Sequence, residues 1–195
     1  MRHLRVLPIL FVAAATPLLA QERARDGGRL VVRIDDVVIG EEEFSLDVVE
    51  DGDETSVNVV VAAAYPPDGT RRAAATFSRR RITVRIAAGG TEVAREYPRG
   101  DRALIVHDGL LGLLAIAGRL EPGPVTLFAP AGGGRRTGSL HELGTERLSP
   151  DGAVLRHLAL RGGNADVELW FDAEGRLMRV AIPSRRLLAD RKAGS

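Results

Sequence analysis

The chain has 195 residues, 27 basic and 26 acidic side chains, a formal net charge of +1 and no cysteine. The lack of cysteine excludes a disulfide framework, a thiol nucleophile, a thiolate metal site and a lipid-modified N-terminal cysteine. The balanced charge gives no reason to expect nucleic acid or an anionic membrane as a partner. The length predicts one ordinary domain that can bury its own core.

The first 20 residues have the three regions of a secretory signal peptide. Arg2 and Arg5 form the basic start, 7–15 is apolar, and Ala20 offers a small residue for cleavage. We therefore expect a periplasmic or secreted mature protein. The expected divisions are a signal peptide over 1–20, a polar lead-in over 21–28, a single β-rich domain over 29–183 and a polar C-terminal tail over 184–195.

Most of the chain beyond the lead-in alternates apolar and polar residues with a period of two. Clear runs cover 30–34, 44–48, 57–61 and 82–86. Such alternation predicts strands with one face in a core, and the turn signals between the runs have hairpin spacing. The expected fold class is mainly β, an antiparallel meander of roughly ten strands forming a curved sheet or half-barrel.

One apolar segment, HDGLLGLLAIAGRL at 107–120, breaks the alternation. Its apolar residues recur at helical spacing, so we expect one helix over about 108–120, with Asp108 as its N-cap. A helix of that length reaches roughly 21 Å, short of a hydrocarbon core of about 30 Å. Because its apolar residues point in most directions, we expect it to lie against the curved sheet and not to span a membrane.

The last predicted hairpin, VELWFDAEGRLMRVAIP at 167–183, carries large apolar side chains on both faces. Leu169 and Phe171 share one face, and Trp170 lies on the other. The pairing across the turn depends on whether Gly175 forms a bulge, because a bulge shifts the register by one residue.

Two histidines flank the turn at 149–152. In the simplest register His157 faces Gly144 and His141 faces Leu160, which places the two imidazoles on opposite faces; a one-residue bulge would reverse this. With no third ligand we expect no metal site. Ser139 lies near His141 but in no nucleophile elbow.

The remaining polar motifs also have simple interpretations. His107 precedes Asp108, and a helix cap explains this pair better than a catalytic base with its orienting carboxylate. The glycine-rich stretch 129–139 lacks the lysine of a phosphate loop. The acidic run 41–43 has no calcium-loop spacing and is interpreted as a solvated turn. We expect no enzyme activity and no cofactor.

The order of elements resembles a known group of bacterial envelope proteins. The chain opens with LVVRIDDVVIGEEEFSLDVVEDGDE, continues as a meander, breaks once for an apolar helix and closes with VELWFDAEGRLMRVAIP. This is similar to uncharacterised periplasmic families related to the LolA/LolB/LppX-type half-barrels. The resemblance implies an unclosed antiparallel sheet curled around a helix, with an apolar concave face that accepts lipid acyl chains. The missing lipidation cysteine and the lack of an extra C-terminal apolar segment depart from the lipoprotein carriers.

We therefore expect a non-catalytic, exported protein that binds a lipid or another apolar small molecule. An envelope structural or protein-interaction domain, in which the helix fills the sheet and leaves no cavity, is the main alternative. A hydrolase using His107 or His141 is a third. The residues expected to line a ligand cavity are Leu110, Leu114, Leu169, Trp170 and Phe171.

Overall fold

The computed structural model describes residues 25–194 except 53, 68, 101, 133, 150 and 151. The expected signal peptide lies outside the described residues, as do the first four residues of the lead-in. The strands are β1 (Arg25–Ile34), β2 (Val37–Asp51), β3 (Glu54–Tyr65), β4 (Gly69–Phe77), β5 (Arg81–Ala88), β6 (Thr91–Pro98), β7 (Ala103–Ile105), β8 (Gly123–Ala129), β9 (Gly134–Arg147), β10 (Val154–Arg161), β11 (Val167–Phe171), β12 (Leu177–Ile182) and β13 (Leu187–Arg191). Three 3₁₀ helices interrupt them: η1 (Leu111–Arg119), η2 (Pro130–Gly132) and η3 (Pro183–Arg185).

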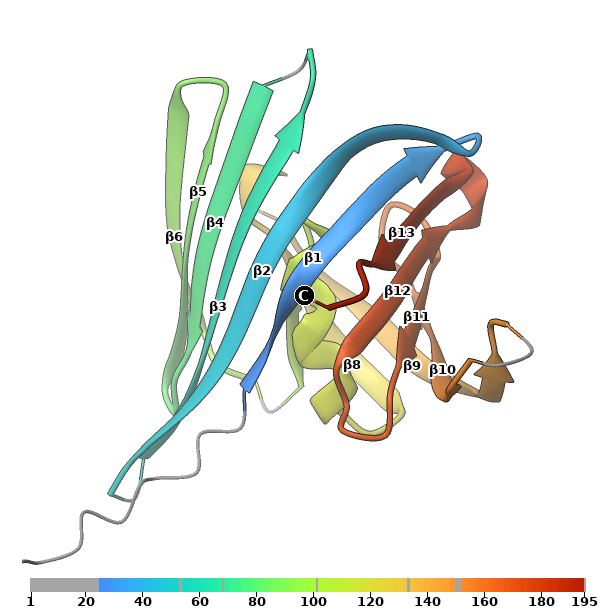
Figure 1. Ribbon diagram of the computed structural model, residues 1–195. Helices are drawn as coiled ribbons and strands as arrows, with labels where there is room; N and C mark the ends of the chain where they lie inside the picture. The colour runs from blue at the N-terminus through green and yellow to red at the C-terminus, as the bar shows by residue number, and fades with distance from the viewer. Residues whose placement is uncertain are drawn as a thin grey trace, which may run out of the picture.

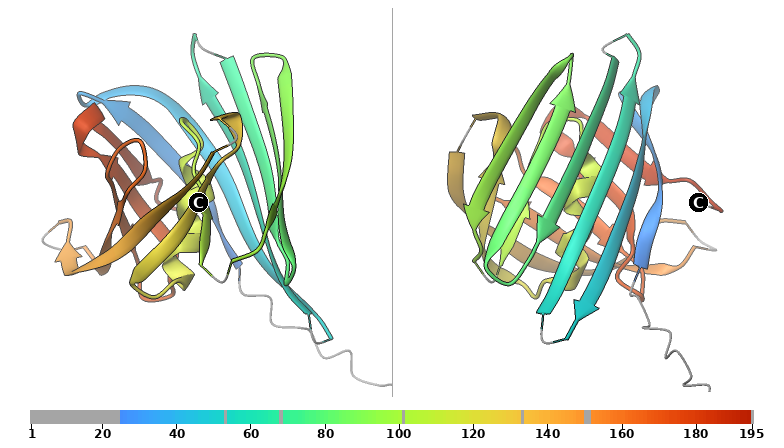
Figure 2. Two further views of the ribbon diagram at one scale, coloured as in Figure 1. Left: turned by 180° about the vertical axis from the view of Figure 1, so that it is seen from behind. Right: turned by 90° about the vertical axis from the view of Figure 1, so that its left-hand side faces the viewer.

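All thirteen strands belong to one open, strongly curved sheet, so the expected mainly β fold with a curved sheet is confirmed. The order is β6-β5-β4-β3-β2-β1-β13-β12-β11-β10-β9-β8-β7. Neighbours are antiparallel except β7 and β8, which run parallel. Figure 1 shows two limbs, β1–β6 and β8–β13, with η1 between them, and both views of Figure 2 show the same arrangement.

The two expected polar ends of the domain are strands. Residues 25–28 begin β1, and residues 187–191 form β13, which pairs with β1 and with β12 in the middle of the sheet. Residues 187–191 of the expected polar tail are therefore part of the sheet and not a tail. A buried ion pair fixes this region: Asp26 accepts hydrogen bonds from the Leu177 backbone N–H at 3.0 Å and from Arg191 Nη1 at 2.9 Å.

The expected helix, η1, lies where the sequence predicts it, with different ends and geometry. It runs over Leu111–Arg119 as a 3₁₀ helix, and every residue from Leu111 to Ala117 is buried. The residue at its N-cap position is Leu110, whose side chain makes no capping hydrogen bond, so the prediction that Asp108 is the N-cap is wrong. In the described part of the chain, no helix is long and apolar enough to cross a membrane.

Two glycines let η1 approach the sheet on both sides. A Cβ on Gly112 would lie 2.6 Å from Phe44 Cβ of β2, and one on Gly118 would lie 2.5 Å from the Gly175 carbonyl oxygen. Glycine is poor in isolated helices, but here any side chain would push the helix off the sheet. Helix η1 therefore fills the curl of the sheet.

The final hairpin has a bulge, which settles its register. Trp170 pairs with Arg179, and Phe171 pairs with Leu177, so Met178 is the extra residue. Leu169 and Phe171 face the core and Trp170 faces outward, as expected. The bulge also turns Leu177 inward, where it is fully buried.

The sheet opens between β6 and β7, which are consecutive in the chain. Although these strands form the two edges of the sheet, Tyr97 of β6 stacks on Phe128 of β8, with ring centroids 4.3 Å apart. The edges therefore meet through side chains and not through a hydrogen-bonded ladder.

Candidate functional site

A cavity of about 240 Å³ lies between the start of η1 and the β8–β13 limb. Its walls come from the segment before η1, the η2 turn, the start of β9, the β10–β11 loop and the end of β12. Its large apolar lining residues are mostly buried and are called the floor here, whereas Asp108, Arg136 and Arg185 are exposed and are called the mouth. Apolar side chains lining it include Leu111, Leu114, Leu160, Val167 and Ile182.

Glu42 of β2 holds the helical wall of this cavity in place. It is 0% exposed, and its Oε2 accepts a hydrogen bond from the Gly112 backbone N–H at 3.0 Å. Its Oε1 accepts a short hydrogen bond from the Tyr65 hydroxyl of β3. One carboxyl group thus joins β2, β3 and the first turn of η1, where orphan N–H groups need an acceptor. Leu111, the neighbour of Gly112, lines the cavity.

Burial controls the proton affinity of this pair. Desolvation raises the pKa of Glu42, although its hydrogen bonds and the nearby Arg71 charge act in the opposite direction. Burial together with the adjacent Glu42 also raises the pKa of Tyr65. The Arg71 guanidinium lies 5.3 Å from the centre of the Tyr65 ring. Its positive charge partly offsets the effect of burial on the Glu42 carboxyl group.

Four titratable side chains stand among the residues that line the cavity. Arg185 donates a hydrogen bond to Asp108 Oδ1 at 2.9 Å. The Asp108 carboxylate therefore pairs with Arg185 and does not cap the helix. Arg136 Nη1 donates to the neutral Asn164 Oδ1 at 2.5 Å. The fourth is His107, whose pKa is lowered chiefly by burial, so its imidazole is neutral near pH 7.

Only one of the five residues expected to line a ligand cavity does so. Leu114 contributes to the floor. Leu110, Leu169 and Phe171 are 1%, 0% and 1% exposed and belong to the solid core. The helix starts at Leu111, later than predicted. Leu110 therefore precedes the helix and packs in the core, and Leu111 lines the cavity.

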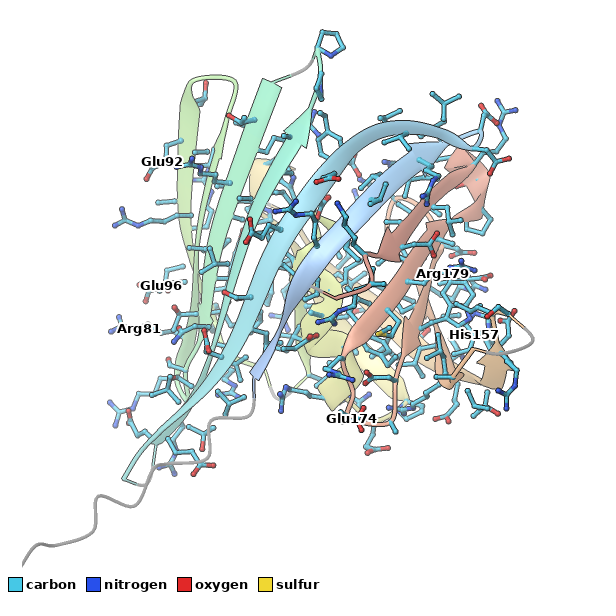
Figure 3. All side chains as sticks on the ribbon, in the orientation of Figure 1. Arg81, Glu92, Glu96, His157, Glu174 and Arg179 are labelled. Carbon is cyan, nitrogen blue, oxygen red and sulfur yellow. The ribbon has the colours of Figure 1, made fainter. Side chains whose placement is uncertain are left out.

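Trp170 lies on the outer face of the sheet, away from the cavity. It is 5% exposed, because His157 stacks on it with centroids 4.2 Å apart and the Arg179 guanidinium covers it at 5.9 Å. Its Nε1 donates to Glu146 Oε2 at 2.8 Å. Figure 3 shows His157 and Arg179 on the outer side of the β8–β13 limb.

The two hairpin histidines share this outer face. His157 pairs with Gly144, as the simplest register predicts, but the register then shifts and His141 pairs with Ala159 instead of Leu160. The shift is the bulge that reverses the predicted arrangement. Within the described part of the chain, no group of three or more His, Asp or Glu side chains could hold a metal ion.

The shifted strand also brings a serine and a histidine into contact. Ser139 Oγ lies 2.7 Å from His141 Nε2 on the exposed outer face. A catalytic serine needs a base, a group that orients the base and a substrate site beside it. Ser139 and His141 lie outside the cavity beside η1.

A second depression, of about 550 Å³, lies beside the start of β1. It is formed mainly by glycines, charged side chains and the last residues of the described chain, including Gly27, Arg29 and Lys192. Its one large apolar neighbour, Phe44, is 3% exposed. It offers little apolar wall, so the cavity beside η1 is the better candidate site.

Glu42 is a part of the candidate site that the sequence analysis does not find, because it interprets the acidic run 41–43 as a solvated turn. The correct signal was available. Phe44 and Leu46 face the core, so a residue two positions earlier on the same strand must face it too. The period of two places Glu42 inside and its neighbours Glu41 and Glu43 outside, as the structure shows.

No protein-family model and no curated protein matches the chain. Among solved structures, it is similar to a beta-barrel-like protein of the domain of unknown function DUF1849 from Brucella abortus, with 9% sequence identity and a TM-score of 0.41 over 86% of this chain and 94% of that one. At that level of likeness the fold assignment rests on the strand order and register of this chain itself. The LolA/LolB/LppX-type relationship stays a prediction.

Proposed function

We propose that the protein binds one small, largely apolar molecule in the cavity beside η1 and catalyses no reaction on it. We also propose that the signal peptide directs its export. The observation that carries the binding proposal is the apolar floor beneath a polar mouth, left open although η1 fills the rest of the curl. Ligand sites have this composition, with apolar walls and a few placed polar groups.

The size of the cavity limits the ligand. A dry cavity of about 150 Å³ is enough for benzene, whereas pockets for drug-sized molecules start at about 300 Å³. At about 240 Å³ the cavity suits a single ring or a short acyl segment. A lipid with several acyl chains would have to leave most of its apolar surface outside.

Extraction of the mature protein from its native envelope, followed by mass spectrometry of the organic phase, tests the proposal directly. We expect a small apolar or amphipathic compound in stoichiometric amount, and displacement of a neutral naphthylamine dye by it. The single tryptophan is a poor reporter of binding, because Trp170 lies on the opposite face of the sheet.

A matched pair of variants locates the binding. Ala165→Phe places a ring at the cavity lining, while Ala173→Phe adds the same ring on the exposed β11–β12 turn. Dye binding should be lost in the first variant and kept in the second. Clean extracts together with equal dye binding by both variants would favour the alternative, a structural domain without a ligand.

A further inference from the structure

We propose that the ligand carries a single negative charge, a carboxylate on a short apolar body, and that Arg136 receives it at the cavity mouth. This inference rests on the proposed function, since it names the chemical class of molecule for the same cavity. The argument comes from the charges that line the mouth and from which of them are already neutralised.

The charged lining residues leave one positive charge without compensation. Arg185 and Asp108 form an ion pair at 2.9 Å and cancel each other. His107 is half-buried, and desolvation lowers its pKa, so its imidazole is neutral near pH 7. Arg136 is therefore the remaining charge, and its side chain donates a hydrogen bond to the neutral amide of Asn164.

The Arg136 guanidinium also has hydrogen-bond donors left for a ligand. A guanidinium has five N–H donors arranged in a planar fork that matches the two oxygens of a carboxylate. The bond from Nη1 to Asn164 uses one of these donors and holds the side chain against the β10–β11 loop. Among the described residues, no carboxylate lies within 4.0 Å of this guanidinium.

The apolar floor and the charged mouth together define an amphiphile. Leu111, Leu160 and Val167 would contact its apolar body, and Arg136 stands with them in the lining of the same cavity. One uncompensated charge matches a monoanion, whereas a phosphate group carries up to two negative charges near pH 7. A neutral or cationic head would leave the arginine without a counter-charge.

A series of eight-carbon compounds separates the two proposals. We would titrate the mature protein calorimetrically with octanoate, octanol, octylammonium and octyl phosphate. We expect octanoate to bind about tenfold or more tightly than octanol, because a charge-assisted hydrogen bond is added. Added salt should lower the affinity for octanoate and leave the affinity for octanol unchanged.

Adjacent arginines provide the matched control. Arg136 lines the cavity and its neighbour Arg135 does not. Arg136→Gln should lower octanoate affinity to that of octanol, while Arg135→Gln should leave it unchanged. Asp108→Asn removes the partner of Arg185 and should strengthen octanoate binding, an effect opposite in sign to that of the first variant.

Each outcome decides between the proposals. Equal affinities for octanoate and octanol, or equal effects of the two arginine variants, would overturn the carboxylate assignment and leave apolar binding standing. Tighter binding of octyl phosphate than of octanoate would overturn the proposal that the ligand carries a single negative charge. If none of the four compounds binds, and Ala165→Phe and Ala173→Phe do not differ in dye binding, the proposed function itself fails.

Discussion

Glu42 and Trp170 lie on the faces of the sheet opposite to those expected from their polarity: the acidic residue faces the core and the aromatic residue faces outward. A carboxyl group that is 0% exposed lies inside the curl, and a tryptophan that is 5% exposed lies on the outer face under ionic side chains. Each is acceptable because its polar atoms have partners: Tyr65 and the Gly112 N–H for Glu42, and Glu146 for the indole. Hydrogen-bond satisfaction, and not polarity alone, decides which side a residue can occupy.

The two residues also differ in what depends on them. Glu42 joins two strands to the helix that forms a wall of the cavity, so its loss would affect the candidate site. Trp170 joins neighbouring strands β9, β10 and β11 on the face remote from the cavity. Disturbing the inner residue should change stability and ligand binding together, whereas disturbing the outer one should change stability alone.

The largest effect is expected from Glu42→Ala. It leaves the Tyr65 hydroxyl and the Gly112 N–H without an acceptor, at about 1–3 kcal/mol each, and opens a cavity as well. We expect the free energy of unfolding in urea to fall by roughly 3–5 kcal/mol. Glu43→Ala is the control, since Glu43 is exposed on the same strand. Similar losses in both variants would show that burial of Glu42 has no special importance.

The next effect is a pH dependence that belongs to the inner residue. Because burial raises the pKa of Glu42 in the folded state above its ordinary value of 4.5, the folded protein keeps this proton where the unfolded chain loses it. The contribution is complete below pH 4.5 and is lost as the pH rises through the raised pKa. Denaturation of wild type and Glu42→Gln at a series of pH values measures it. The difference between the two should vary with pH in this direction, and a constant difference would contradict it.

The smallest effect is expected from Trp170→Phe. The ring that stacks on His157 is largely kept, but the indole N–H to Glu146 is lost, which costs about 1 kcal/mol. Urea denaturation should show this loss, while octanoate and dye binding should stay at wild-type values. A change in binding affinity would mean that the outer face is coupled to the cavity.

Much of the fold could be predicted from the sequence, because alternation is a local signal. The strands at 30–34, 57–61 and 82–86 and the inward direction of Leu169 and Phe171 follow from a period of two. The β13 strand could not be predicted in this way. Its five residues include two charged ones, and Asp190 and Arg191 are accommodated by partners distant in sequence, such as Arg33 and Asp26.

The candidate site was harder to predict than the fold. The cavity is assembled from loops between strands, including the β10–β11 loop and the η2 turn, and their approach depends on the curvature of the whole sheet. Leu114 could be named because it lies in the one apolar helix. A period of two from the buried Leu140 puts Arg136 on the inner face of β9 and Arg135 on the outer face, but it does not show that a cavity lies there.

The pairing of β1 with β13 has a consequence for how the protein folds. Leu30 lies opposite Arg191, so the ladder at the centre of the sheet joins residues from nearly opposite ends of the described chain. Long-range pairing of this kind slows folding, because the closure entropy of the intervening chain must be overcome before the contact forms. In the strand order, β13 is the strand that joins β1–β6 to β7–β12, so the two halves of the sheet become one only when β13 pairs with both β1 and β12.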